Sequence, residues 1–308
     1  MLINKYRIKK AIRSPFGAII RTFGYEKFKW ISDENYLKIM FKYYIGHRLN
    51  LINPASYNEK LQWIKLYDRK PEYTKYVDKI AVREFIAKMI GEEYLVPLIG
   101  AWNTPDEIDF STLPDQFVLK CNHNSGTGMC ICKDKASINI EEVKDNLWKG
   151  LKEDYFYLGR EWPYKNVKRK ILCEKYLVDE SGTELKDYKV MCFNGEPKLI
   201  ELHSGRFTDH QAQDFYDLDW NKTDITQGVI SVFGASSVTI PKPNTLEKML
   251  DFSRILSRGI PHVRIDWYSI NENLYFGEMT FFDGSGFDPY DRFEDDLLLG
   301  SWIKLDNA

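Results

Sequence analysis

The sequence predicts an α+β fold in which helices come first and β-hairpins follow. From Asp33 to about Ile90, apolar residues recur at helical spacing. Further along, the Asn194–Gly195 pair between two apolar runs is a strong hairpin signal. A second hairpin is predicted over 263–286, where a polar turn at 271–273 separates two apolar runs. A chain of 308 residues has room for one large or two medium domains.

The overall composition excludes several classes of protein. With 44% hydrophobic and 29% charged residues, the chain is typical of globular proteins. Its net charge of −2 argues against a nucleic acid partner. The five cysteines are odd in number and lack zinc-site spacing, which favours reduced thiols in a cytoplasmic protein. Since no apolar run reaches about 18 residues, no transmembrane helix is expected.

The first thirty residues alternate basic and apolar positions. They carry eight Lys or Arg against the single acid Glu26, a charge of +7, which leaves −9 on the remainder. Pro15 and Gly17 favour two short helices over one. Such a segment can lie on an anionic membrane, here the inner leaflet, or it can pack on the acidic remainder of the chain. Both interpretations stay open.

Two helices are predicted before the first strands. Ser56 and Glu59 form a capping-box pattern that starts a helix within 53–67. A second amphipathic helix is predicted over 74–91, with Gly91 as its C-cap. It carries Lys79 and Arg83 one turn apart, a pair that is usually solvated surface.

A loop containing two glycines follows a strand predicted over 117–120. The strand ends in Lys120, and the loop NHNSGTGM leads into a returning strand. Gly126 and Gly128 allow backbone N–H groups to approach an oxyanion, and Lys120 adds positive charge. The loop lacks the GK[ST] ending of a Walker A motif. A plain hairpin turn is the alternative.

The remaining elements alternate helix and strand patterns. We expect short strands over 94–97 and 170–179, strands on both sides of the Asn194–Gly195 turn within 187–206, and helices over 137–160 and 240–259.

The hairpin over 263–286 brings charged side chains together. Arg264 and Asp266 share one strand face, as do Glu278 and Thr280 on the next strand. Two carboxylates on neighbouring strands repel unless a cation lies between them, and oxygen ligands suit Mg²⁺. The arginine offers a planar fork for phosphate. An exposed hairpin with a surface salt bridge is the alternative.

Taken in order, these segments resemble the ATP-grasp ligases over about residues 74–290. The resemblance rests on Lys79, FVLK with its glycine loop, ILCEKYL, DYKV and RID…GEMT. SYNEKLQWIKLYDR, DYKVMCFNG and FGEMTF…GSG are most similar to the TupA-like branch, which is associated with bacterial surface polysaccharides. The resemblance implies an ATP-grasp fold, two α+β subdomains gripping ATP. It also implies a helical region at 1–73 and an ATP-grasp domain at 74–308, with a lid at about 113–175.

The resemblance also implies roles for individual residues, with ATP and Mg²⁺ as cofactors. The ATP-binding set would be Lys79, Lys120, Ser125, Gly126, Thr127, Gly128, the adenine hinge Glu174, Lys175 and Leu177, and the ribose-binding Asp187. The metal ligands would be Asp266, Glu278 and Thr280, although the family often has asparagine where Thr280 stands. The catalytic set would be Arg264, Lys120, Ser285, Gly286 and Arg206, with His123 as a further candidate.

The implied reaction joins a carboxylate to an amine through an acyl phosphate. By resemblance, the carboxylate belongs to a uronic acid in a nucleotide- or lipid-linked saccharide, and the partner is an amino acid or another amine. A glycosyltransferase is the alternative, because Asp217 and Asp219 form an Asp-x-Asp triplet. A nucleotide-binding adaptor without catalysis is less consistent with metal-ligating acids.

Overall fold

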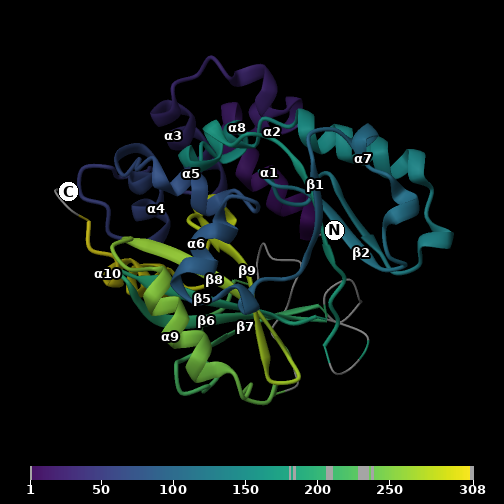
Figure 1. The fold of residues 1–308 in the computed structure, drawn as a ribbon. Coiled ribbons are helices and arrows are strands. Elements are labelled where there is room, and N and C mark those ends of the chain that lie inside the picture. The colour runs from purple at the N-terminus through teal and green to yellow at the C-terminus, as the bar shows by residue number, and fades with distance from the viewer. Residues whose placement is uncertain are drawn as a thin grey trace.

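Two antiparallel sheets and an N-terminal group of helices make up the molecule (Figure 1). The computed structural model describes residues 2–179, 182, 185–205, 211–227, 236 and 239–305, with side chains from residue 8 onward. In the described chain, no helix has the length and apolar character needed to cross a bilayer.

The N-terminal helices form a small cluster with its own core. They are α1 (Leu2–Arg13), α2 (Pro15–Phe23), the 3₁₀ turn η1 (Tyr25–Phe28) and α3 (Asp33–Tyr44). The break before Pro15 confirms two short helices. Gly17 lets α2 approach α3 closely, because a Cβ there would lie 2.7 Å from the Cβ of Tyr43. The inner face of α2 therefore packs on α3.

Helix α4 (Tyr57–Tyr67) starts as predicted. The Ser56 hydroxyl accepts the N–H of Glu59 at 3.3 Å, and the Glu59 carboxylate accepts the N–H of Ser56 at 3.3 Å. This is the predicted capping box.

The single helix predicted over 74–91 is wrong, because the chain forms α5 (Glu72–Val77) and α6 (Val82–Met89). Asp78 makes the break. Its Oδ1 accepts the N–H groups of Ile80 at 2.9 Å and Ala81 at 3.2 Å, bonds that compete with a continuous helix. Lys79 therefore lies in a turn, where its N–H donates to the carbonyl of Asn122 at 3.1 Å.

The smaller sheet has the order β1-β4-β2-β3, all antiparallel. Its strands are β1 (Leu98–Trp102), β2 (Phe117–Cys121), β3 (Met129–Cys132) and β4 (Ile171–Lys175). The strand predicted over 94–97 is only a bridge at Leu95, after which β1 begins beyond Pro97. Helix α7 (Ile140–Lys152) packs on this sheet through Leu147 and Leu151.

The helix predicted over 137–160 also divides, into α7 and α8 (Tyr155–Gly159). Asp154 lies at the break, where its carboxylate accepts from Lys29 and Arg169. These bonds draw the chain toward the N-terminal helices and away from the axis of α7. Short 3₁₀ turns complete this half: η2 (Glu92–Tyr94), η3 (Pro105–Glu107), η4 (Phe110–Thr112), η5 (Lys135–Ser137) and η6 (Trp162–Asn166).

The larger sheet has the order β7-β6-β5-β8-β9 and carries the main core. Its strands are β5 (Asp187–Phe193), β6 (Glu196–Ser204), β7 (Ala212–Tyr216), β8 (His262–Ile270) and β9 (Asn273–Thr280). The turn at Asn194–Gly195 confirms the predicted hairpin. Helix α9 (Leu246–Leu256) packs on the sheet, and α10 (Phe293–Trp302), which follows η7 (Asp283–Gly286), packs on α4.

Candidate active site

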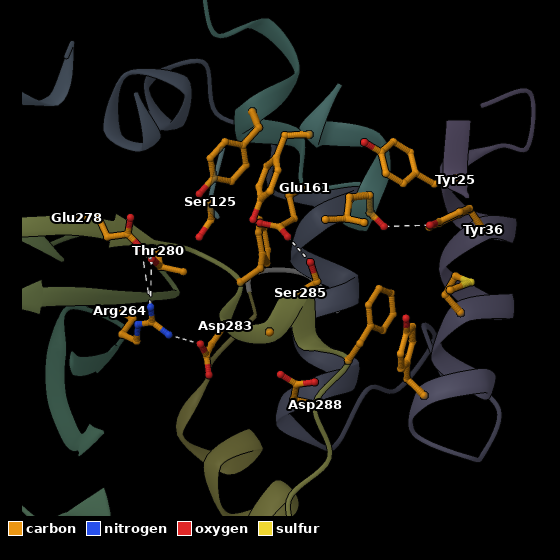
Figure 2. A pocket seen from close by; sticks show the side chains of 18 of the residues that line it. Tyr25, Tyr36, Ser125, Glu161, Arg264, Glu278, Thr280, Asp283, Ser285 and Asp288 are labelled. Carbon is orange, nitrogen blue, oxygen red and sulfur yellow. Dashed lines mark hydrogen bonds and ion pairs between the residues drawn. The ribbon is translucent and has the colours of Figure 1, made fainter. Parts of the chain in front are cut away.

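A cavity of about 570 Å³ lies between the larger sheet, the glycine loop and the N-terminal helices. Figure 2 shows Arg264, Glu278 and Asp283 on one side of it and Tyr25 and Tyr36 on the opposite side. We call the first side, built by β8, β9 and η7, the floor. The cavity is of ordinary size for a small-molecule site.

The pairing of β8 with β9 places the charged residues of the floor. Arg264 lies opposite Thr280 and Asp266 opposite Glu278, as the alternation along each strand predicted. Arg264 makes a two-pronged contact with Asp266, from Nε to Oδ1 at 2.7 Å and from Nη2 to Oδ2 at 2.8 Å. Arg264 and Asp266 are only 6% and 3% exposed, so the alternative of a surface salt bridge is wrong.

A second cation holds Asp266 from the neighbouring strand. Lys189 of β5 lies opposite Asp266 and donates to its Oδ2 at 2.8 Å; it also lies 3.9 Å from Asp187. Burial alone would raise the pKa of Asp266, but Arg264 and Lys189 outweigh it and hold that pKa well below its ordinary value. Sequence reasoning missed Lys189, although alternation within DYKV places it on the same face as Asp187.

Two more acids, which the sequence reading also missed, surround Arg264. Asp283 accepts from its Nη1, and Glu201 of β6 lies 3.7 Å from it. Glu201 is 1% exposed and accepts from His203 at 2.5 Å and Gln213 at 2.9 Å, while its Oε2 has no hydrogen-bond partner. Burial opposes ionisation of Glu201, yet the nearby His203 and Arg264 lower its pKa to about 2.

Among the described residues, carboxylates outnumber the lysine and arginine side chains around the floor. Five carboxylates share the cations Lys79, Lys189 and Arg264; they are Asp187, Glu201, Asp266, Glu278 and Asp283. Buried acid in excess, with one orphaned carboxylate oxygen, fits an added cation. No group of three or more potential metal ligands occurs among the described residues. Mg²⁺ commonly takes one or two carboxylates and fills its other positions with water and phosphate oxygens.

Glu278 is better placed than Asp266 to bind Mg²⁺ in this way. The Glu278 side chain is 35% exposed and lines the cavity, whereas both oxygens of Asp266 already accept from cations. The hydroxyl of Thr280 donates to Glu278 Oε1 at 2.9 Å, so Thr280 orients this carboxylate.

Lys79 joins the floor to the glycine loop. Its Nζ lies 3.6 Å from Glu278 Oε2 and donates to the carbonyl of Asn124 at 2.8 Å. Burial lowers the pKa of Lys79, and Glu278 opposes that effect in part. The solvated-surface interpretation is wrong, because the side chain is only 14% exposed.

Lys120 and Arg83 converge on Glu174 in the smaller sheet. Lys120 Nζ lies 2.6 Å from Glu174 Oε2, and Arg83 Nη1 lies 3.2 Å from Oε1. Sequence reasoning did not connect Arg83 with this cluster, because Arg83 and Glu174 are 91 residues apart in the chain. Next to them, Lys175 is exposed and Leu177 is half-buried.

Of the two loop glycines, Gly128 is needed for close packing and Gly126 is open to solvent. A Cβ on Gly128 would lie 2.7 Å from Cys121 Sγ and 2.8 Å from Gly150 Cα, so this glycine lets the loop pack on α7. Gly126 has a φ of +87° and nothing within 4 Å of an added Cβ. Ser125, Gly126 and Thr127 are exposed, and Ser125 lines the cavity. The tip of the loop is thus open to a ligand.

The turn η7, which carries the candidate catalytic residues Ser285 and Gly286, is held in place by side chains of α4. Gln62 donates to the carbonyl of Gly286 at 2.8 Å, and the fully buried Lys65 donates to the carbonyl of Ser285 at 2.7 Å. The N–H of Ser285 already donates to Phe282 O at 3.0 Å, and its hydroxyl donates to Glu161.

A further candidate, His123, does not line the cavity. His123 is 2% exposed, hydrogen-bonds the carbonyl of Glu153 at 3.2 Å, and has a pKa lowered to about 4 by burial. Arg206 lies outside the described residues.

Residues 59–304 match the family described as TupA-like ATP-grasp. The chain belongs to this family. The membership confirms the predicted ATP-grasp fold and ATP with Mg²⁺ as cofactors. No match was found among curated proteins.

Solved ATP-grasp structures show weak similarity to the chain. It is 17% identical to D-alanine–D-alanine ligase from Bacillus anthracis, covering 67% of this chain and 57% of that one with a TM-score of 0.37. The Helicobacter pylori D-alanine–D-alanine ligase is 13% identical over 82% of this chain and 70% of its own, with a TM-score of 0.41. The assignment rests on the family match and not on these likenesses.

Proposed function

We propose that this ATP-grasp chain joins a carboxylate to an amine through an acyl phosphate. The observation that supports the proposal most is the position of Lys79, which contacts both the glycine loop and Glu278 of the floor. A triphosphate in the cavity between loop and floor would meet Lys79 and Ser125 on one side and Arg264 on the other.

Each group has a separate task in this mechanism. Lys79, Lys120 and the N–H groups near Gly126 would hold the ATP phosphates. Glu278 would be the main carboxylate that holds Mg²⁺, with Asp266 as the second acid beside it. When bound, Mg²⁺ neutralises charge on the phosphates. Arg264 steadies the γ-phosphoryl group while a carboxylate oxygen attacks its phosphorus and the bond to ADP breaks.

The second step forms the amide. The amine nitrogen attacks the acyl carbon, inorganic phosphate leaves, and the nitrogen gives up a proton. Water must stay away from the acyl phosphate during this step, which the enclosure by the glycine loop and the N-terminal helices favours. The adenine would lie near Glu174, Lys175 and Leu177, with Asp187 toward the ribose.

The proposed substrates follow the resemblance to polysaccharide enzymes. The carboxylate would be that of a uronic acid in a nucleotide- or lipid-linked saccharide for capsule or O-antigen synthesis, and the amine an amino acid or similar compound. The domain boundaries at 73/74 and the lid at about 113–175 are part of the same proposal.

Contact with the inner leaflet of a membrane is a further part of the proposal. Ile8, Ile12 and Phe23 of α1 and α2 are 58%, 75% and 58% exposed beside basic residues. Replacing all three by serine should reduce co-sedimentation with anionic liposomes, while neutral liposomes serve as the control. Equal co-sedimentation of the wild type and the triple variant with anionic liposomes would contradict the proposed membrane contact.

The decisive experiment screens uronic acids against amino acids in the presence of ATP and Mg²⁺. ADP formation that requires both an acid and an amine supports the ligase. Calorimetry should also show heat on titration of Mg-ATP into the chain. Absence of that heat would overturn the proposal.

The glycosyltransferase alternative depended on Asp217 and Asp219. Asp217 Oδ1 accepts the N–H groups of Asp219 at 3.0 Å and Asn221 at 2.7 Å, so this carboxylate caps its own turn. The triplet therefore has a structural use, and we do not retain that function.

A further inference from the structure

One wall of the cavity comes from the N-terminal helices, ahead of the family match that begins at residue 59. Arg21 of α2, Tyr25 of η1, and Tyr36 and Tyr44 of α3 line it. In Figure 2, Tyr25 and Tyr36 face the floor across the cavity. We call these four residues the N-terminal wall.

The N-terminal wall is held firmly against the rest of the site. The hydroxyl of Tyr36 donates to the carbonyl of Leu158 at 2.9 Å, and the Tyr44 ring stacks on Phe287 with centroids 5.5 Å apart. Phe287 directly follows the floor turn η7. The wall therefore has a fixed position relative to Asp283 and Ser285, as a substrate subsite requires.

A buried arginine strengthens this attachment. Arg160, at the end of α8, is 2% exposed, donates to Asp33 at 3.1 Å and to the carbonyl of Phe28 at 3.2 Å, and lies over the Tyr36 ring at 4.5 Å. These contacts connect η1, α3 and α8, three segments that surround the cavity. Losing them would move the wall.

The chemistry of the wall differs from that of the floor. In the described part of the site, the floor holds more carboxylates than lysine and arginine cations, whereas the wall offers tyrosine rings and the cation of Arg21. Arg21 is exposed, and no carboxylate of the described chain lies within 4 Å of its guanidinium. Tyrosine rings suit the apolar face of a sugar ring, and a free guanidinium suits a phosphate or carboxylate.

We propose that the N-terminal wall is the acceptor subsite and binds a saccharide that carries a second anionic group remote from the reacting carboxylate. The inference rests on the proposed ligase function, since the reacting carboxylate must reach Arg264 on the floor. The sugar ring lies along the half-buried Tyr25 and Tyr44, while the buried Tyr36 holds the wall in place. The second anion, a glycosyl diphosphate in either a nucleotide- or a lipid-linked acceptor, meets Arg21.

Calorimetry with UDP-glucuronic acid and with free glucuronic acid tests the subsite. For Arg21→Gln, the Kd of UDP-glucuronic acid should rise roughly tenfold, the loss of one charge-assisted contact, while the Kd of glucuronic acid changes less than about twofold. Arg48→Gln is the matched control, because Arg48 is exposed and lies outside this cavity. Tyr25→Ala should weaken both ligands.

Titration of Mg-ATP into the same variants separates the two proposals. If Mg-ATP binds and UDP-glucuronic acid binds equally well to the wild type and Arg21→Gln, the subsite is wrong and the ligase proposal stands. If UDP-glucuronic acid gives no heat with the wild type, the subsite is also wrong. If Mg-ATP itself does not bind, the ligase proposal fails first.

Discussion

Lys79 Nζ lies 3.6 Å from Glu278 Oε2, although the two residues belong to a turn between helices and to the last strand of the larger sheet. The same Nζ donates to the carbonyl of Asn124 in the glycine loop. One side chain thereby connects both sheets at the cavity. The ion pair is only partly shielded, so a triphosphate and Mg²⁺ can take over its two halves.

Glu278→Gln should abolish ADP formation while the protein stays folded. The amide keeps the size of the side chain but removes the negative charge that faces the cavity, and we expect a loss on the order of 100-fold or more. A coupled ADP assay measures the effect. Glu272→Gln, in the exposed β8–β9 turn, is the control. Full turnover in Glu278→Gln would show that Glu278 is not a metal ligand.

Asp266→Asn tests the same site, but this substitution should also lower the stability of the fold. Both oxygens of Asp266 pair with buried cations, so the substitution leaves Arg264 and Lys189 without their main partner. We expect a loss of about 3–5 kcal/mol in the free energy of unfolding, measured by urea denaturation. A variant as stable as the wild type would show that the three charges are solvated after all.

Lys79→Ala should weaken ATP binding more than it weakens the fold. The loss of one phosphate contact is expected to raise the Kd of Mg-ATP roughly tenfold, as calorimetry would show. Lys75→Ala removes an exposed lysine of α5 and should leave the Kd within about twofold. Equal Kd values in the two variants would place the triphosphate elsewhere.

Substitutions at the two loop glycines should have different effects, one on stability and the other on ATP binding. Gly128→Ala should lower the thermal midpoint strongly, because its Cβ would meet Cys121 and the backbone of Gly150. Gly126→Ala should cost only about 1–2 kcal/mol, the strain of a positive φ, yet it should raise the KM for ATP. If Gly126→Ala leaves that KM unchanged, the loop is a plain hairpin turn.

Glu201 should make the protein sensitive to acid. Because its folded pKa of about 2 lies below that of the unfolded chain, it stabilises the fold above about pH 4.5, and this stability is lost as the pH falls toward 2. The full effect is up to about 3 kcal/mol. Unfolding free energies at pH 7, 5 and 3.5 should fall less steeply in Glu201→Gln than in the exposed control Glu196→Gln.

Much of the floor followed from local pattern. The alternation of side chains along a strand placed Arg264 with Asp266 and Glu278 with Thr280, and the pairing of β8 with β9 confirmed both faces. Capping at Ser56 and the Asn194–Gly195 turn are equally local, because each depends on bonds within a few residues.

Contacts between distant segments decided the rest. The break at Asp78 also engages Asn122, 44 residues away, so helical periodicity could not reveal it. Lys189, Glu201 and Asp283 became site residues only when β5, β6 and η7 met around Arg264.

The sequence by itself determined the class of fold, the acidic hairpin and the glycine loop, because strand alternation and turn chemistry act over short distances along the chain. Only the tertiary structure decided that the N-terminal helices close the cavity. Their inner face is apolar like that of any packed helix, and the partner that buries it lies more than a hundred residues away, as Tyr36 and Leu158 show.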